Sequence, residues 1–194
     1  MELVLATGNV GKQRELAALL APRGCDLILQ TALGIATADE TGHTFQANAL
    51  LKARHAAQGA GLPALADDSG LEVDALDGRP GVHSARYAGT HASDADNLAL
   101  LLEELTGVPE ALRTARYRCV IAFVRSPDDD APLIASGSWE GRIATLPQGA
   151  GGFGYDPAFI AEHETRTVAQ MSSAEKNAVS HRAKALAALM AQWV

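Results

Sequence analysis

The chain has 194 residues, of which 47% are hydrophobic and 20% are charged, and this supports one globular domain spanning residues 1–194, with or without two lobes. Its 23 acidic residues outnumber 16 basic ones, so the formal net charge is −7. This balance excludes a broad basic surface for a nucleic-acid backbone or an anionic membrane. Any phosphate must therefore be bound locally.

The cysteine content and the amino-terminal residues indicate a cellular compartment. Cys25 and Cys119 are too few for a disulfide framework, which favours a reducing environment. The chain begins with an early acid, Glu2, and reaches a Gly-Asn turn before a signal-peptide core could form. No apolar run has the length needed to cross a bilayer. We therefore expect a soluble cytoplasmic protein.

The first half of the chain alternates short apolar runs with helical periodicity. It predicts a strand over residues 3–6, a helix over 12–20, a strand over 26–30, a helix from a Thr44 N-cap to about Gln58, and a strand over 62–68. Alternation resumes over 71–74, and the glycine-rich stretch 77–90 is predicted to be a long loop.

The second half predicts both a hairpin and helices. A capping box at Ser93 and Asp96 opens a helix that reaches Leu105, and the runs 117–124 and 133–143 are typical of a hairpin. A final helix is expected from Ser172 through Leu189. Crossover-length connections together with a hairpin indicate an α/β protein with a mixed sheet.

Two adjacent carboxylates, Asp67 and Asp68, end an apolar run and precede Ser69 and Gly70. At a strand exit such a pair can send one carboxylate into a cleft and leave the other to anchor the turn, because successive side chains point to opposite faces. This arrangement suits a metal and a water. The sequence Asp-Asp-Ser-Gly is also typical of a simple turn. The pattern leaves open which of the two aspartates has which role.

A glycine-containing turn lies where the first strand meets the first helix. Backbone N–H groups and the helix N-terminus can bind an anion there, and Lys12 can reach a phosphate oxygen. It is not a P-loop, because Ala6 replaces the first glycine and Gln13 follows the lysine. A plain connecting turn is the alternative. The residues concerned are Thr7, Gly8, Asn9, Val10, Gly11 and Lys12.

Two later segments carry groups suited to a nucleobase. The glycine-dense stretch 148–157 can expose Phe153 for stacking, and Asp156 could accept from a ring or ribose donor. Its alternative is a flexible loop whose aromatic residues pack into the core. The stretch 172–182 adds Lys176, His181 and Arg182, which in isolation are equally typical of a solvated helix.

Together these segments resemble the inosine triphosphate pyrophosphatase family, in order along nearly the whole chain. The resemblance rests on Thr-Gly-Asn-Val-Gly-Lys at 7–12, Glu-Thr-Gly at 40–42, Asn48 with Lys52, Ala-Asp-Asp-Ser-Gly at 66–70, Gly-Val-His-Ser-Ala-Arg-Tyr at 81–87, Gly-Gly-Phe-Gly-Tyr-Asp-Pro at 151–157 and Ser-His-Arg at 180–182. It implies an elongated mixed sheet with flanking helices, forming two lobes around a nucleotide-binding cleft, and a homodimer.

The resemblance also implies an activity and a set of site residues. The activity is Mg²⁺-dependent hydrolysis of ITP, dITP or XTP to a monophosphate and pyrophosphate. Asp68 matches the proton acceptor and a metal ligand, and Glu40 matches the other acidic metal-site residue. The matching substrate contacts are residues 7–12, Lys52, Ser69, Phe153, Gly154, Tyr155, Asp156, Lys176, His181 and Arg182.

The implied chemistry is physically sensible. Mg²⁺ binds through few carboxylates and keeps several waters, and a water deprotonated by Asp68 could attack the α phosphorus. Donors on His181 or Arg182 would pair with the 6-oxo group of hypoxanthine or xanthine and oppose the amino group of adenine, so ATP should be a poor substrate. This argument does not explain how GTP is rejected.

Two other functions are weighed against this one. A phosphatase with an aspartyl nucleophile normally has a carboxylate two residues further on, whereas Ser69 and Gly70 follow Asp68. A non-catalytic nucleotide-binding module would need the glycine-rich loops but no acidic metal pair. Both are therefore less favoured.

Overall fold

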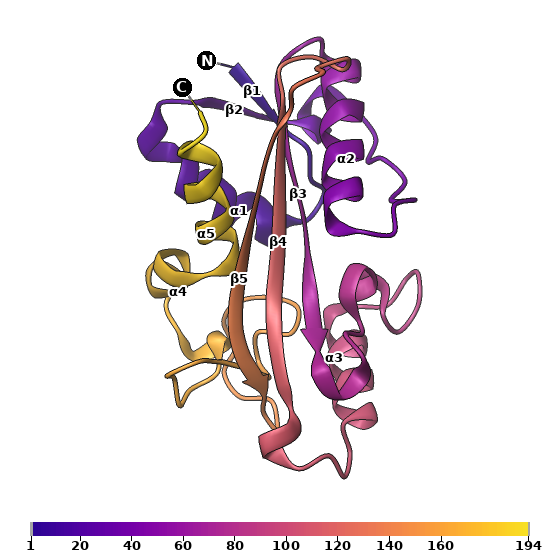
Figure 1. Cartoon of the computed structure of the whole chain (residues 1–194), viewed down its shortest axis with the longest axis vertical. Helices are drawn as coiled ribbons and strands as arrows, with labels where there is room; N and C mark the ends of the chain where they lie inside the picture. Colours follow the sequence, from indigo (N-terminus) through magenta and orange to yellow (C-terminus); the bar gives the residue numbers. More distant parts are fainter. Residues whose placement is uncertain (1, 194) are drawn as a thin grey trace. The chain divides into compact units, whose positions relative to one another are not determined.

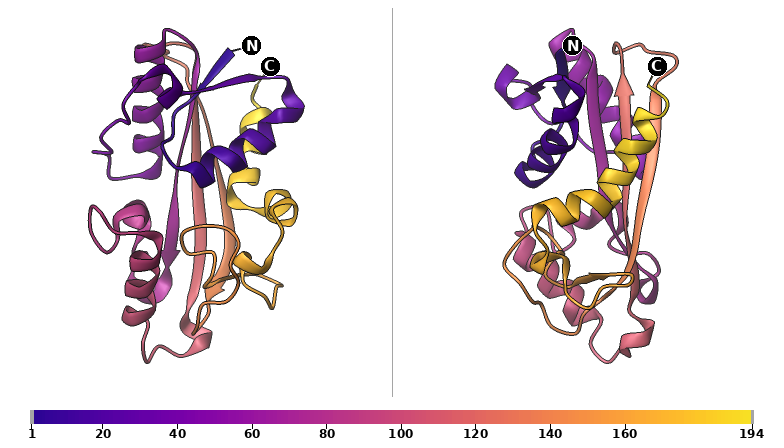
Figure 2. Two further views of the ribbon diagram at one scale, coloured as in Figure 1. Left: turned by 180° about the vertical axis from the view of Figure 1, so that it is seen from behind. Right: turned by 90° about the vertical axis from the view of Figure 1, so that its left-hand side faces the viewer.

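The computed structural model describes residues 2–193 and contains a six-stranded mixed sheet with helices (Figures 1 and 2). The strand order is β2-β1-β3-β4-β5-β6. Strand β1 pairs in parallel with β2 and β3, whereas β5 pairs with β6 in antiparallel orientation. The mixed α/β class predicted from the sequence is confirmed.

The elements follow one another in the order β1 (Glu2–Leu5), α1 (Val10–Leu20), β2 (Asp26–Leu29), α2 (Phe45–Ala60), β3 (Ala64–Val73), α3 (Asp94–Glu104), β4 (Thr114–Val124), β5 (Leu133–Ile143), β6 (Phe159–Ala161), α4 (Ser173–Val179) and α5 (His181–Met190). The chain forms two compact units. Unit 1 comprises Met1–Asp68, Cys119–Gly137 and Arg182–Val194, and unit 2 comprises Ser69–Arg118 and Ser138–His181.

Unit 1 has an apolar core on each face of its strands. Leu3, Leu5 and Leu65 pack with buried side chains of α1 and α5, whereas Val4 and Ala64 pack with the alanines of α2. Accordingly, α1 and α5 lie on one side of these strands and α2 on the other (Figures 1 and 2). The period of two along β1 and β3 therefore decides which helix each strand side chain meets.

Unit 2 has a single core rich in aromatic rings. Tyr117, Trp139 and Phe159 come from three different strands, and buried leucines of β3 and α3 pack with them. The ring centroids of Tyr117 and Phe159 are 4.6 Å apart at an interplanar angle of 54°, which is a favourable tilted contact.

The predicted helix N-caps at Thr44, Ser93 and Ser172 are confirmed. The Thr44 side chain accepts a hydrogen bond from the Ala47 N–H at the start of α2, and Gly61 ends that helix in the left-handed region. Both halves of the capping box are present at Ser93 and Asp96. The stretch 77–90, expected to be a loop, contains a 3₁₀ helix over Gly81–Arg86.

Two predicted boundaries are wrong. No turn follows Asp68, because β3 continues to Val73 and buries Leu71 and Val73 in the unit 2 core; burial of these side chains outweighs the turn preference of Ser-Gly. The final helix is also interrupted. The extended backbone of Ser180 separates α4 from α5, in keeping with the preference of serine for helix ends.

Candidate active site

The turn between β1 and α1 is shaped by side-chain hydrogen bonds to the backbone. The Asn9 side chain caps α1 by accepting from the Lys12 N–H at 3.0 Å, and Thr7 Oγ1 accepts from the Asn9 N–H at 3.2 Å. Gln13 Nε2 donates to the Thr7 carbonyl at 2.9 Å. The helix therefore begins at Val10, two residues before the predicted start, with an N-terminus that can bind an anion.

Gln13 stands where a P-loop would have serine or threonine. In the structure it holds the carbonyl at the start of the turn. Its separation of six residues from Thr7 matches no helical contact spacing, so the pattern carries no signal for this bond.

Asp67 lies on the face of β3 that meets α1 and α5. Its Oδ2 is 3.3 Å from Lys12 Nζ and 3.2 Å from Arg182 Nη2. Arg182 also binds Glu15 through Nη1. Asp67 and Arg182 are each about 1% exposed, so this is a buried ion pair that needs both partners.

Nearby acidic groups outweigh the effect of burial on the pKa of Arg182. Burial alone would lower the pKa of its guanidinium, but the nearby Asp67, Cys119 and Glu15 raise that pKa above its ordinary value. The structure therefore places Arg182 with carboxylates of unit 1, whereas His181, its neighbour in the sequence, belongs to unit 2.

Asp68 lies on the opposite face of β3, toward α2. The Lys52 ammonium is 2.8 Å from Asp68 Oδ1 and 2.8 Å from Glu40 Oε1, so one cation joins two carboxylates that come from distant segments. The strand period alone separates Asp67 from Asp68, as the sequence predicted.

Asn48 connects Asp68 to the segment that carries Glu40. Its Nδ2 donates to Asp68 Oδ2 at 3.2 Å, and its Oδ1 accepts from the Gly42 N–H at 2.8 Å. A Cβ on Gly42 would lie 2.6 Å from Asn48 Oδ1, so only glycine permits this close approach. Asn48 contributed to the family resemblance without an assigned role.

The surroundings of Asp68 and Lys52 shift the pKa values of both side chains. Burial raises the pKa of the Asp68 carboxyl above its ordinary value, although Lys52 and Lys12 oppose the shift. Burial lowers the pKa of Lys52, but Asp68, Asp67 and Glu40 more than compensate and raise it. Asp68 is thus a stronger proton acceptor than an exposed aspartate, next to a lysine that stays charged.

Glu40 and Asp68 supply carboxylate oxygens that suit a hard metal ion. Within residues 2–193 no group of three or more His, Cys, Asp or Glu side chains could hold one. Glu40 and Asp68 nevertheless share a single cation, the Lys52 ammonium, so both carboxylates can reach one positive charge. Two hard oxygen donors fit Mg²⁺, which usually takes one or two carboxylates and keeps its waters.

The predicted base residues of unit 2 form a second cluster. Asp156 Oδ2 accepts from Lys176 Nζ at 2.6 Å and from the Phe153 N–H at 2.9 Å. Lys176 Nζ lies 4.5 Å from the centroid of the Phe153 ring. The His181 ring stacks on Tyr117, with centroids 4.7 Å apart and an interplanar angle of 14°. The structure thus brings Phe153, Asp156, Lys176 and His181 into one network.

The remaining predicted residues lie beside these clusters. Tyr155 is 4% exposed and packs in the unit 2 core, where its hydroxyl donates to the Ser84 carbonyl at 2.8 Å. The Gly154 N–H donates to Asp94 Oδ2 at 2.8 Å. Ser69 follows Asp68 on β3 and is half-buried.

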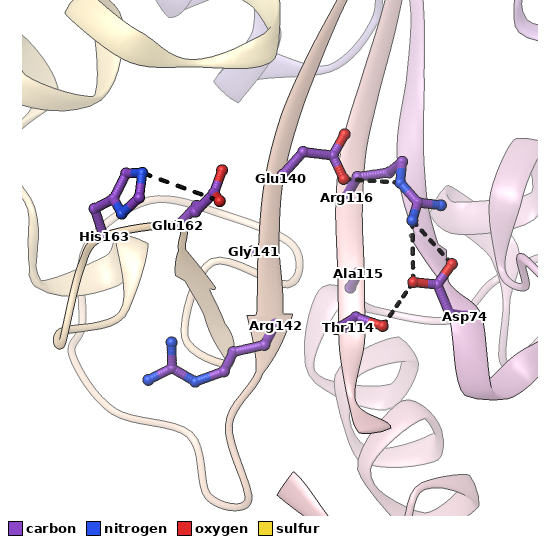
Figure 3. Close-up of a pocket in the computed structure, with 9 residues that line it drawn as sticks. All are labelled: Asp74, Thr114, Ala115, Arg116, Glu140, Gly141, Arg142, Glu162 and His163. Carbon is purple, nitrogen blue, oxygen red and sulfur yellow. Dashed lines mark hydrogen bonds and ion pairs between the residues drawn. The ribbon is translucent and has the colours of Figure 1, made fainter. Parts of the chain in front are cut away.

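Two hollows lie away from these clusters. One, of about 520 Å³ in unit 2, is lined by residues of β4 and β5 and by Asp74, Glu162 and His163, and in it Arg116 binds Asp74 and Glu140 (Figure 3). The other, of about 780 Å³ in unit 1, borders Leu50, Arg54 and Pro127. None of the predicted site residues lines either hollow.

Comparisons with known proteins identify the family to which the chain is similar. The model of the Ham1 family matches residues 3–192. A dITP/XTP pyrophosphatase of Shigella flexneri is 54% identical over 189 residues, 97% of this chain and 96% of its own, and a dITP/XTP pyrophosphatase of Yersinia pseudotuberculosis is 57% identical over 185 residues, covering 95% and 94%.

Solved structures agree as well. A HAM1 protein from Coxiella burnetii has a TM-score of 0.90 at 47% identity and covers 100% of this chain and 98% of its own. A nucleoside-triphosphatase / dITP/XTP pyrophosphatase from Mycobacterium abscessus has a TM-score of 0.78 at 43% identity and covers 98% and 99%. The chain belongs to the Ham1 family, and the resemblance seen in the sequence is confirmed.

Proposed function

We propose that this protein is a dITP/XTP pyrophosphatase, which hydrolyses purine nucleoside triphosphates with unusual bases to the monophosphate and pyrophosphate. Relatives with this name are 54% and 57% identical over nearly the whole chain. The structural observation that carries the proposal is the Lys52 ammonium shared at 2.8 Å by Glu40 and Asp68.

Unit 1 supplies groups for the triphosphate end. The N-terminal amides of α1 and the Lys12 ammonium bind phosphate oxygens, and Lys52 offsets the charge of the leaving group. Glu40 and Asp68 would hold Mg²⁺, which when bound neutralises phosphate charge and polarises water. Asp67 keeps Lys12 in place, at 3.3 Å.

The reaction needs one proton acceptor, and Asp68 is suited to it. Asp68 takes a proton from a water as the water oxygen forms a bond to the α phosphorus. The bond from that phosphorus to the oxygen bridging the β phosphorus breaks, and pyrophosphate leaves with the electron pair. The raised pKa of Asp68 supports its role as the base.

Unit 2 supplies groups for the base. The Phe153 ring offers a stacking surface, and His181 offers a ring N–H to a 6-oxo group. Asp156 binds Lys176 and the Phe153 backbone, so we assign it an orienting role. The three nitrogens of Arg182 engage carboxylates of unit 1, and we assign Arg182 to the phosphate end.

We also propose that the protein is a cytoplasmic homodimer. The family resemblance supports the dimer, and the two free cysteines, Cys25 and Cys119, are consistent with a reducing compartment. Within residues 2–193 no helix is long and apolar enough to span a membrane. Light scattering at micromolar concentration tests the dimer, and a monomeric mass would contradict it.

Product analysis tests the activity. Purified protein is incubated with dITP, dATP and dGTP under magnesium, and pyrophosphate and orthophosphate are measured separately. We expect pyrophosphate from dITP, little product from dATP, and at least 10²-fold slower turnover after Asp68→Asn, in line with the loss of a general base. Orthophosphate as the direct product would refute the proposal, and tight binding without turnover would favour a binding module.

A further inference from the structure

We propose that Tyr117 is a positioning residue for base selection, an inference that rests on the proposed function. Tyr117 lies on β4, in unit 2, and contacts two of the predicted base residues at once. Its hydroxyl donates to Asp156 Oδ1 at 3.1 Å. Its ring stacks on His181 with centroids 4.7 Å apart and an interplanar angle of 14°.

The Tyr117 hydroxyl donates a hydrogen bond to a buried carboxylate. Asp156 is 1% exposed, and its other oxygen accepts from Lys176 Nζ and the Phe153 N–H. Tyr117 therefore holds one oxygen of Asp156 while the other oxygen holds the ammonium and the loop that present Phe153. A hydrogen bond to a buried charged group contributes more than one between neutral groups.

The loop leaves little space for Asp156 to move. A Cβ on Gly152 would collide with Asp156 Oδ2, and Gly152 has a φ of +71°. The carboxylate thus packs directly against the loop backbone. A shift of Asp156 would move the Phe153 ring that it positions, together with Lys176 above that ring.

The ring of Tyr117 also has a structural role, because it packs against Phe159 in the unit 2 core. The hydroxyl can be separated from this role. Tyr117→Phe keeps the ring that contacts Phe159 and His181 and removes the hydroxyl that donates to Asp156. A change in base preference would therefore report the positioning of Asp156 and not the loss of core packing.

The experiment compares Tyr117→Phe with Tyr87→Phe. Tyr87 also donates its hydroxyl to a carboxylate, that of Glu104, but it is not among the proposed site residues. We measure kcat and KM for dITP and dATP, the affinity for dIMP by calorimetry, and the melting temperature. For Tyr117→Phe we expect KM for dITP and Kd for dIMP to rise about tenfold, as for loss of a hydrogen bond to a buried charge.

The expected pattern is specific. In Tyr117→Phe, kcat for dITP stays within about twofold, and the preference for dITP over dATP falls about tenfold, whereas Tyr87→Phe retains the wild-type preference. Combining Tyr117→Phe with Asp156→Asn should add little to the loss caused by Asp156→Asn alone, because both changes act on one network.

An unchanged preference in folded Tyr117→Phe protein, or an equal loss for dITP and dATP, would overturn the proposal. So would full additivity with Asp156→Asn. Failure of the proposed function gives a different result, since the wild-type protein would then release no pyrophosphate from dITP. In that case an unchanged affinity for dIMP in Tyr117→Phe would still overturn the role of Tyr117.

Discussion

Replacing Arg182 by methionine tests whether this residue anchors unit 1 or contacts the base. Its guanidinium lies 3.2 Å from Asp67 Oδ2 through Nη2 and 3.3 Å from it through Nε, and it also binds Glu15. Methionine fills much of the same volume without charge. Arg182→Met would therefore leave two carboxylates without their guanidinium partner, one of them in an almost fully buried position.

The magnitude follows from the burial of the pair. Removing one partner of a buried ion pair typically costs about 3–5 kcal/mol, and Lys12, 3.3 Å from Asp67, offsets part of this cost. We expect a loss of about 3 kcal/mol, which corresponds to a melting temperature about 6–12 °C lower for a chain of this size.

The assay is urea unfolding followed by circular dichroism, with Arg166→Met as the matched control. Arg166 also binds two carboxylates, Glu164 and Glu175. Its side chain is 38% exposed, whereas that of Arg182 is 1% exposed, so the loss of Arg166 should shift the unfolding midpoint far less. Adding Asp67→Asn to Arg182→Met should recover part of the stability, because it removes the buried charge.

Two results would refute this reasoning. One is a loss of stability below about 1 kcal/mol in Arg182→Met. The other is a double variant with Asp67→Asn that is as unstable as the sum of the single variants. The ratio of dITP to dATP turnover should change by less than about threefold, since no base contact is lost. Collapse of that ratio would instead support the direct base contact predicted from the sequence.

Three further predictions concern Asn48, Lys52 and Glu175. Asn48→Ala should destabilise the protein by about 1–3 kcal/mol, because the fully buried Asn48 joins Asp68 to the Gly42 N–H; urea unfolding measures the loss, and an unchanged midpoint would contradict it. Lys52→Met should lower kcat for dITP about 10²-fold, because a charge close to the leaving group is lost; steady-state kinetics that show only a KM effect would contradict this role. The Arg166 guanidinium and the cap hydrogen bonds hold the pKa of Glu175 at about 2, below the pKa of this side chain in the unfolded protein. Ionised Glu175 therefore stabilises the fold at pH values above its unfolded pKa. This stabilisation is lost as the pH falls toward 2. Glu175→Gln should accordingly lower the urea midpoint at pH 7 but have a much smaller effect near pH 2.

Local signals made most of the fold predictable. The short apolar runs that predicted strands over residues 3–6 and 62–68, the capping boxes and the turn residues act within a few positions of the chain, and the structure confirms the elements they predicted. The prediction was wrong at Ser180, where the helix breaks, and at Ser69, where tertiary packing outweighs a local turn preference. Leu71 and Val73 bury in the unit 2 core, and this burial keeps the chain extended through a sequence typical of a turn.

The sequence indicated which residues belong to the candidate site, but it did not indicate which partners each of them contacts. Arg182 and Asp67 are 115 positions apart, and Tyr117 and Asp156 are 39 apart. Contacts at such separations leave no periodic signal in one sequence. A tyrosine in an apolar strand is equally typical of a core residue, so only the position of its hydroxyl reveals the link to Asp156.

The paired aspartates illustrate how one residue type takes two roles. Asp67 and Asp68 are adjacent, but β3 turns them toward opposite faces, and the cations that meet them differ in kind. Asp67 meets a buried guanidinium, which has no accessible neutral form, so that pair stays charged. Asp68 meets the lysine that also binds Glu40, and its own pKa is raised by burial. A proton acceptor needs a pKa closer to the working pH, and burial moves the pKa of Asp68 in that direction.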